Sequence, residues 1–232
     1  MLDIHGKPLI QHVYECACKS TAKDVIIATD DQRIEEAVKR FDAKCCMTGR
    51  EHPSGTDRLA EVVELFGIAD TEIIVNLQGD EPMMPAGLLD QVAMSLENTP
   101  DAAMSTLCEV IQTPDEVFDP DIVKVIFDQS GSALYFSRAP IPWARGAYDE
   151  QNRSRISVNN SFRHIGLYAY RAGFLRRYPQ LPACQLEQQE ALEQLRALYH
   201  GFRIQVEIAA EPAGVGVDTP ADLDKVREML KA

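Results

Sequence analysis

The sequence predicts an α/β fold: a doubly wound, mostly parallel sheet with an inserted antiparallel hairpin lobe. Through the first half of the chain, short apolar runs alternate with segments of helical spacing, as in a sheet that carries helices on both faces. Two apolar runs stop abruptly at a carboxylate, one at Asp80 and one at Asp218. Beyond residue 118 the alternation ends, and two strand-like runs flank a polar turn.

The first half of the chain contains the elements of the predicted parallel sheet. Pro8 suits the first turn of a helix, and Asp30 or Asp31 suits the cap of the next helix. The run that leads to Asp80 is apolar without alternation, so we expect a strand covered on both faces. In order, the expected helices cover residues 9–17, 34–41, 59–66 and 88–96, and the expected strands cover residues 24–28, 43–47, 73–77 and 103–110.

The second half of the chain has a different organisation. Strands at residues 123–127 and 133–136 flank a five-residue turn, which predicts an antiparallel hairpin. An irregular stretch over residues 137–161 follows, and loops of that length are usually functional or mobile. We expect one domain over residues 1–232, with an inserted lobe at about residues 118–185. The later elements expected are strands at residues 165–170 and 204–208 and helices at residues 186–199 and 220–231.

The composition excludes several classes of partner. A formal net charge of -13 over 232 residues, with no basic stripe, argues against nucleic acid and against an anionic membrane surface. No apolar run approaches the roughly 20 residues of a membrane span, and the N-terminal residues lack a signal-peptide core. The six cysteines lack the paired spacing of a metal site or a disulfide scaffold, so we expect reduced thiols and a cytoplasmic protein.

The two carboxylates at strand ends are the first candidate site. Gly79 relaxes the backbone before Asp80, and Pro82 prevents the strand from continuing. Asp218 follows a short apolar run and precedes Thr219, just before the last helix. Two such carboxylates can share one Mg²⁺, which keeps several waters and takes other ligands from substrate phosphates. The alternative interpretation is that both are helix-capping aspartates.

A second candidate site lies before the third helix. Ser54, Gly55, Thr56 and Arg58 stand where unpaired backbone N–H groups and the helix dipole favour an anion, and the guanidinium adds a bidentate donor. A phosphate fits there, although an N-capping loop with a solvated arginine explains the same residues. Gln78 offers amide groups at a strand end, which suits recognition of a base or a sugar and equally suits loop structure.

A third group of polar residues lies in the second half of the chain. His164 and Tyr168 are four apart on a strand, so both side chains face the same side and can enter one cleft. The alternative for His164 is a core histidine bonded to backbone. Glu193 and Gln194 lie off the leucine stripe of their expected helix, and solvation on the helix surface is the alternative interpretation for both.

Taken together, these segments resemble the cytidylyltransferases that activate acidic sugars. The resemblance covers almost the whole chain, and its motifs are specific in combination. The related sialic acid cytidylyltransferases share the fold but lack the segments at residues 78–82 and 192–196 in this form. The resemblance rests on residues 6–8, 11–14, 28–31, 54–58, 78–82, 136–138, 164–168, 192–196 and 216–220.

The resemblance implies a nucleotide-diphospho-sugar transferase fold, which is Rossmann-like, and a magnesium-dependent reaction. In it the anomeric hydroxyl of a sugar acid, expected to be 3-deoxy-manno-octulosonate (Kdo), attacks the α-phosphate of CTP and releases pyrophosphate, for lipopolysaccharide assembly. The hairpin lobe is the expected contact of a homodimer. By likeness to the family, Asp80 and Asp218 are catalytic and hold the metal, Ser54, Gly55, Thr56, Arg58 and Gln78 bind the nucleotide, and Arg138, His164, Tyr168, Glu193 and Gln194 line the sugar pocket.

One departure from the family concerns the N-terminus. Family members open with an apolar strand and a loop rich in Arg, Ser, Gly and Lys around the CTP phosphates, whereas Met1 stands where that loop has ended. We expect either a start upstream of Met1 or an impaired chain, since unpaired strand edges and lost cationic donors weaken folding and turnover. The alternatives to catalysis on Kdo are a non-catalytic sugar-acid-binding chain without the phosphate loop and a cytidylyltransferase for another sugar acid, such as a sialic acid.

Overall fold

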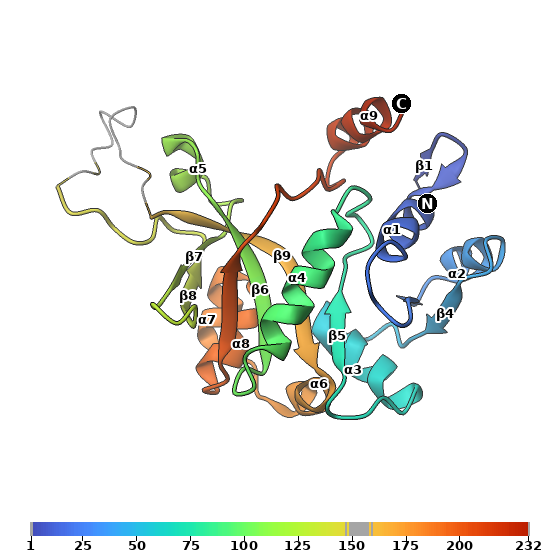
Figure 1. The fold of residues 1–232 in the computed structure, drawn as a ribbon, viewed down its shortest axis with the longest axis horizontal. Coiled ribbons are helices and arrows are strands. Elements are labelled where there is room, and N and C mark those ends of the chain that lie inside the picture. The colour runs from blue at the N-terminus through green and yellow to red at the C-terminus, as the bar shows by residue number, and fades with distance from the viewer. Residues whose placement is uncertain (1, 147, 149–157, 159, 232) are drawn as a thin grey trace.

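The computed structural model describes residues 2–146, 148, 158 and 160–231, and its centre is a six-stranded sheet (Figure 1). The sheet has the order β10-β6-β9-β7-β8, and β5 pairs with β9 as well. Part of the expected irregular stretch, at residues 147, 149–157 and 159, lies outside the described residues. The strands are β5 Ile73–Asn76, β6 Met104–Val110, β7 Lys124–Phe127, β8 Ala133–Ser137, β9 Phe162–Arg171 and β10 Ile204–Ile208.

Most strands of this sheet run in one direction. β9 is antiparallel to β5, β6 and β7, and β10 is parallel to β6, so β5, β6, β7 and β10 share a direction. β8 returns antiparallel to β7, which is the predicted hairpin. The predicted α/β class with a mostly parallel sheet is therefore confirmed, and the long β9 is the strand that joins the sheet to the lobe.

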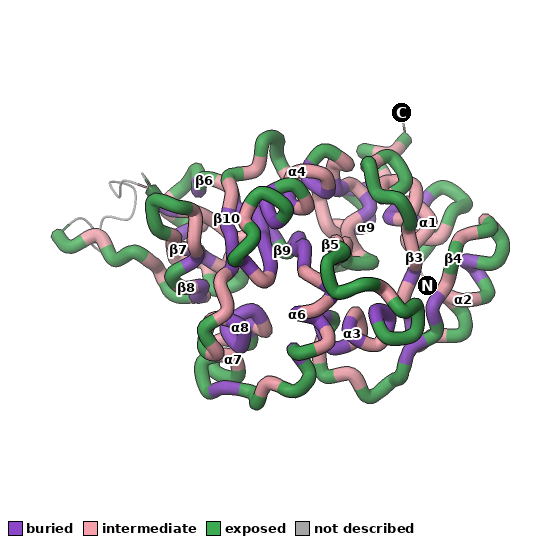
Figure 2. Tube along the Cα trace, turned by 60° about the horizontal axis from the view of Figure 1, so that its bottom comes forward, coloured by how far each residue is buried: buried purple, intermediate pink, exposed green. Residues whose placement is uncertain are grey.

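Helices cover both faces of the sheet. α4 (Ala86–Glu97) packs Leu88 and Val92 with Ile165 and Leu167 of β9. The opposite face of β9 carries Tyr168 and other side chains that belong to the second core. This alternation is the two-residue period of a strand buried on both sides. Figure 2 shows the buried residues gathered along β9 and β10. The second face is covered by α3 (Gly55–Leu65), α6 (Ala172–Arg177) and α8 (Gln194–Tyr199).

The N-terminal elements form a smaller layer beside this sheet. β3 (Ile26–Thr29) and β4 (Lys44–Met47) pair in parallel as a separate two-stranded sheet, connected by α2 (Gln32–Lys39). Among the described residues, β5 pairs only with β9, so one of its edges has no strand neighbour. The expectation that residues 73–77 are covered on both faces is confirmed, because Ile73 and Val75 pack against one core and Ile74 against the other, although the open edge leaves these side chains only partly buried.

The two ends of the chain pack together (Figure 1). α9 (Pro220–Met229) begins at Thr219, whose side chain caps the helix, as predicted. Its apolar face shares a small core with Ile4, and Arg227 donates to the carbonyl of Asp3 at 2.8 Å. The helix therefore lies against the N-terminal segment, which contains β1 (Asp3–Ile4), β2 (Lys7–Pro8) and α1 (Leu9–Ala17).

The expected single helix over residues 186–199 is wrong, because the chain breaks it in two. α7 (Gln185–Glu190) ends at Ala191, which adopts a left-handed conformation with φ 52° and ψ 50°, and α8 begins at Gln194. The break turns the polar residues after Ala191 toward the sheet. Two shorter elements complete the fold, α5 (Pro114–Phe118) and a 3-10 turn at Tyr178–Gln180, which packs against α3 and α6.

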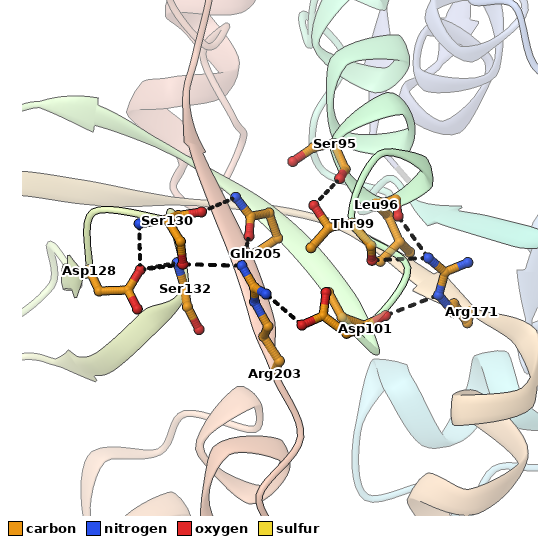
Figure 3. A network of polar contacts seen from close by, with 11 residues as sticks. Ser95, Leu96, Thr99, Asp101, Asp128, Ser130, Ser132, Arg171, Arg203 and Gln205 are labelled. Carbon is orange, nitrogen blue, oxygen red and sulfur yellow. Dashed lines mark hydrogen bonds and ion pairs between the residues drawn. The ribbon is translucent and has the colours of Figure 1, made fainter.

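A polar network anchors the hairpin turn to the start of β10 (Figure 3). Arg203 forms an ion pair with Asp101 at 2.6 Å and donates to the hydroxyl of Ser130 at 3.2 Å. Gln205 donates to the carbonyl of Ser130 at 3.1 Å, and Asp128 accepts from the turn backbone. These contacts are internal to the fold, and they join the turn between β7 and β8 to β10 across the sheet.

The left-handed Ala191 predicts a stabilising substitution. Ala191→Gly should raise the free energy of unfolding by about 0.5 to 1 kcal/mol, because glycine adopts positive φ without the steric cost of a Cβ. Urea unfolding measures the change. As a matched control, Ala93→Gly in the middle of α4 should lower the free energy of unfolding by about 1 kcal/mol. A destabilised Ala191→Gly protein would contradict the assigned backbone conformation.

Candidate active site

The structure brings Asp80 and Asp218 together. The backbone N–H of Val217 donates to the carbonyl oxygen of Asp80 at 2.8 Å, so the loop after β5 and the loop before α9 are adjacent. A Cβ added to Gly214 would collide with the backbone of Met83, which shows how closely the loops approach. Burial raises the pKa of Asp80, and the nearby charge of Asp218 raises it further.

Glu81 is a third carboxylate at this place, and the sequence analysis missed it. Burial, followed by the charges of Asp80 and Asp218, raises the pKa of Glu81 to about 7. A Cβ on Gly216 would lie 2.9 Å from Glu81 Oε1, so the loop of Asp218 passes close to this side chain, and a larger residue there would displace the carboxylate. The sequence shows that Glu81 directly follows Asp80. It does not show which of these two side chains turns toward the interior after the strand ends.

This donor set fits a hard divalent cation. No Lys or Arg of the described residues forms an ion pair with Asp80, Glu81 or Asp218 within 4.0 Å, so the negative charge is uncompensated. Carboxylate oxygens of this kind suit Mg²⁺, which takes one or two protein carboxylates and completes its shell with water and substrate phosphates. Among the described residues no group of three or more His, Cys, Asp or Glu side chains is placed to hold a metal ion, so an ion held by two carboxylates would take its other ligands from water and substrate.

A cavity of about 430 Å³ opens beside this acidic group. Gln78, Gly79 and Asp80 line it on the side of β5, and Thr29 lines it at the end of β3. Small-molecule sites are commonly of this size, with apolar walls and a few polar groups that orient the ligand. The remaining lining residues are apolar: Leu2, Leu9, Ile10, Ile27, Ala28 and Ile34.

The residues before α3 have internal partners. The hydroxyl of Ser54 caps the helix by accepting from the N–H of Asp57 at 3.2 Å, as the capping alternative expects. Thr56 is buried against the hydroxyl of Tyr170 at 3.2 Å. Arg58 pairs with Asp30 at 3.4 Å.

No contact among the described residues joins these groups to Asp80. A nucleotide role for Ser54, Gly55, Thr56 and Arg58 therefore remains a prediction. Gln78 differs from them, because it lies on the wall of the cavity that Asp80 also lines.

The predicted sugar-pocket residues of β9 and α8 lie close together. The rings of His164 and Tyr168 are 5.2 Å apart between centroids, so both face the same side of β9, as predicted. Burial, and then neighbouring charges that include Glu193, raise the pKa of Tyr168 well above its usual value. Gln194 is 4% exposed, and its Nε2 has no hydrogen-bond partner among the described residues. The surface interpretation of Gln194 is wrong, because the break at Ala191 directs it inward.

Arg138 lies at the other side of that break. Its Nε donates to the carbonyl of Glu190, the last residue of α7, at 2.8 Å, and its Nη1 donates to the carbonyl of Pro120 at 2.9 Å. The guanidinium is thus oriented by two carbonyls at the end of β8. Nη2 has no partner among the described residues and is available to an anionic group.

Comparison with known proteins decides the family. The family model described as Cytidylyltransferase matches residues 1–206. The chain belongs to the cytidylyltransferase family. A cytidylyltransferase of Nitrosococcus oceani, named 3-deoxy-manno-octulosonate cytidylyltransferase, is 54% identical over 231 residues, covering 99% of this chain and 89% of the relative. A protein of the same name from Vibrio vulnificus is 52% identical over 233 residues, covering 100% and 91%.

Two solved structures are similar to this chain. The chain resembles CMP:2-keto-3-deoxy-manno-octonic acid synthetase complexed with CTP, with a TM-score of 0.86 and 43% identity over 98% of this chain and 89% of that one. The fold is also that of 4-diphosphocytidyl-2C-methyl-D-erythritol synthase, at a TM-score of 0.63 and 14% identity over 99% and 92%. No helix in the described part of the chain is long and apolar enough to cross a membrane.

The buried Glu81 predicts a pH dependence of stability. Its pKa is raised from 4.5 to about 7 in the folded protein, so the unfolded chain ionises first as the pH rises. In metal-free buffer the native protein should therefore lose stability between pH 4.5 and 7 through this group. Glu81→Gln should remove that loss. The difference in melting temperature between the two proteins should grow across this window and stay constant above it. An unchanging difference would contradict the burial of Glu81.

Proposed function

We propose that this chain transfers CMP from CTP to the anomeric hydroxyl of Kdo, giving CMP-Kdo and pyrophosphate. The single observation that carries the proposal is the convergence of Asp80 and Asp218 beside a cavity of about 430 Å³. The names of the relatives support CTP and Kdo as substrates: they are 3-deoxy-manno-octulosonate cytidylyltransferases, and the similar solved structure is a synthetase complexed with CTP.

The reaction requires the protein mainly to position the two reactants and to neutralise the charge of the phosphates. A bond forms between the anomeric oxygen and the α-phosphorus of CTP, the bond from that phosphorus to the β-phosphate oxygen breaks with release of pyrophosphate, and the hydroxyl proton passes to water. Asp80 and Asp218 are the residues that would hold Mg²⁺, which when bound would offset the negative charge of the phosphates. Gln78, on the cavity wall, is placed to orient the nucleotide.

The sugar acid would lie toward β9 and the α7–α8 break. Nη2 of Arg138 is free among the described residues to meet the sugar carboxylate, for which a planar guanidinium is suited. The unpaired amide of Gln194 is a buried donor that a sugar hydroxyl would satisfy. His164, Tyr168 and Glu193 complete this side of the pocket.

We further propose a cytoplasmic homodimer that supplies lipopolysaccharide assembly. All six cysteines are free, which suits a reducing compartment. The lobe presents exposed apolar side chains that a second copy would cover, among them Leu134 on β8 at 60% exposure and Leu186 on α7 at 39%. Sedimentation of the full-length protein tests the dimer, and a monomer at micromolar concentration would contradict it.

The acidic pair predicts the effect of charge removal on turnover. Asp80→Asn and Asp218→Asn should each lower the rate of pyrophosphate release from CTP, Kdo and Mg²⁺ by roughly 100-fold or more. Asp115→Asn is the matched control, because it removes the same charge from an exposed position on α5 and should leave the rate unchanged. Full activity in either variant, or no pyrophosphate from the natural full-length protein, would overturn the proposed function.

Two substrate tests separate the alternatives. Exchange of Kdo for a sialic acid should abolish pyrophosphate release, and faster turnover with the sialic acid would assign the chain to that substrate. Calorimetry should detect binding of both CTP and Kdo. Binding of Kdo without CTP would instead indicate a non-catalytic sugar-acid-binding chain.

The unpaired amide of Gln194 predicts a variant in which binding of Kdo weakens while the protein stays as stable as before. Gln194→Leu should raise KM for Kdo by about 3- to 10-fold, because a hydrogen bond to the sugar is lost. The same change should leave the melting temperature equal or higher, because the free protein no longer buries an unsatisfied donor. Gln188→Leu, on the exposed face of α7, is the matched control and should change neither quantity. An unaltered KM in Gln194→Leu would remove this residue from the pocket.

A further inference from the structure

The strand β9 contains a bulge where it passes β6. Thr106 of β6 pairs with Tyr168, whereas the next residue, Leu107, pairs with Ile165. Gly166 and Leu167 therefore have no partner residue on β6, and the ladder is interrupted at this point. Bulges of this kind re-aim side chains and leave backbone groups that need another partner. The side chain nearest the interruption on β6 is that of Thr106.

The hydroxyl of Thr106 contacts three groups across the bulge. This fully buried Oγ1 lies 2.8 Å from the carbonyl oxygen of Leu167, 3.1 Å from that of Ile165 and 2.9 Å from Nε2 of His164. A hydroxyl carries one hydrogen, and a carbonyl oxygen can only accept. When that hydrogen points at the carbonyl of Leu167, the shortest of the three contacts, Nε2 of His164 is left to donate to Oγ1.

This assignment determines what the other ring nitrogen of His164 can do. Burial lowers the pKa of His164 to about 3, so the ring is neutral at physiological pH and carries one hydrogen. With that hydrogen on Nε2, Nδ1 is an acceptor. Among the described residues no group donates to Nδ1, and the side chains packed on the ring are Phe136 and Tyr168, at 5.1 and 5.2 Å between centroids.

The far side of the bulge faces the loop that leads to Asp80. The carbonyl of Gly166 accepts from Nε2 of Gln78 at 3.2 Å, and a Cβ on Gly166 would lie 3.0 Å from the same nitrogen. The bulge is therefore held from two sides, by Thr106 from within the sheet and by Gln78 from the cavity wall.

We propose that Thr106 is a positioning residue, which holds His164 as the Nε2–H tautomer so that Nδ1 accepts a hydrogen bond from a hydroxyl of the sugar acid. The inference rests on the proposed function, because the sugar acid is the ligand that this pocket is proposed to take. Thr106 itself does not touch the substrate. Its effect passes through the imidazole and through the two carbonyls of the bulge.

The tautomer can be measured directly in the unmodified protein. Long-range ¹H–¹⁵N spectra of the full-length chain, labelled with ¹⁵N-histidine, distinguish a protonated from an unprotonated ring nitrogen, and comparison with His164→Asn assigns the signals. We expect Nε2 protonated and Nδ1 unprotonated throughout the neutral range, and we expect the Nδ1 signal to move when Kdo is added. Protonation of Nδ1, or an Nδ1 signal indifferent to Kdo, would overturn the proposal.

Kinetics of two variants complete the test. Thr106→Val removes the hydroxyl and should raise KM for Kdo by about 3- to 10-fold while KM for CTP changes little, because one hydrogen bond to the sugar is misplaced. Thr106→Ser keeps the hydroxyl and should restore the natural KM. An equal rise of KM for Kdo in both variants would indicate that Thr106 acts only through packing, and it would overturn the proposal. Should Thr106→Val not fold, the tautomer spectrum of the natural protein decides.

The two levels of proposal fail differently. If the natural protein releases pyrophosphate but His164 carries its hydrogen on Nδ1, the role of Thr106 is wrong and the proposed function stands. If the tautomer is as expected but CTP and Kdo give no pyrophosphate, the proposed function is wrong. A sugar hydroxyl is then no longer supported as the hydrogen-bond partner of Nδ1.

Discussion

One backbone hydrogen bond, from Val217 to the carbonyl of Asp80 at 2.8 Å, brings the two acidic loops of the candidate site together. It joins the end of β5 to the loop before α9, segments that are remote in the sequence. Gly214 and Gly216 let the second loop approach the first so closely that side chains there would collide with Met83 and Glu81. The packing of α9 on the N-terminal segment holds this loop in place.

The convergence of acids has an energetic cost that the rest of the fold must offset. Asp80 and Glu81 are partly buried, and no basic side chain among the described residues pairs with them, so burial and mutual repulsion raise both pKa values. Active sites commonly retain such unfavourable charge because a ligand uses it. A cation shared with the substrate phosphates would convert this repulsion into attraction at the moment of binding.

Local patterns in the sequence predicted much of this arrangement, because apolar spacing, caps and strand-end carboxylates are encoded by neighbouring residues. The break between α7 and α8 was not predictable. The spacing of the leucines fits one long helix as well as two short helices, and alanine is not a residue type that signals positive φ. The role of Thr106 was hidden for a different reason. It depends on a bulge in β9, a strand distant along the chain, whereas its own segment has the pattern of an ordinary buried strand.

Binding of a paramagnetic cation tests the shared site of the two acids most directly. Mn²⁺ can be titrated into the full-length protein in the presence and absence of CTP and followed by electron paramagnetic resonance. If Asp80 and Asp218 share one ion with the nucleotide, CTP should tighten Mn²⁺ binding in the natural protein, and this enhancement should vanish in Asp80→Asn and in Asp218→Asn alike. Enhancement that survives in either variant would contradict a common ion between these carboxylates.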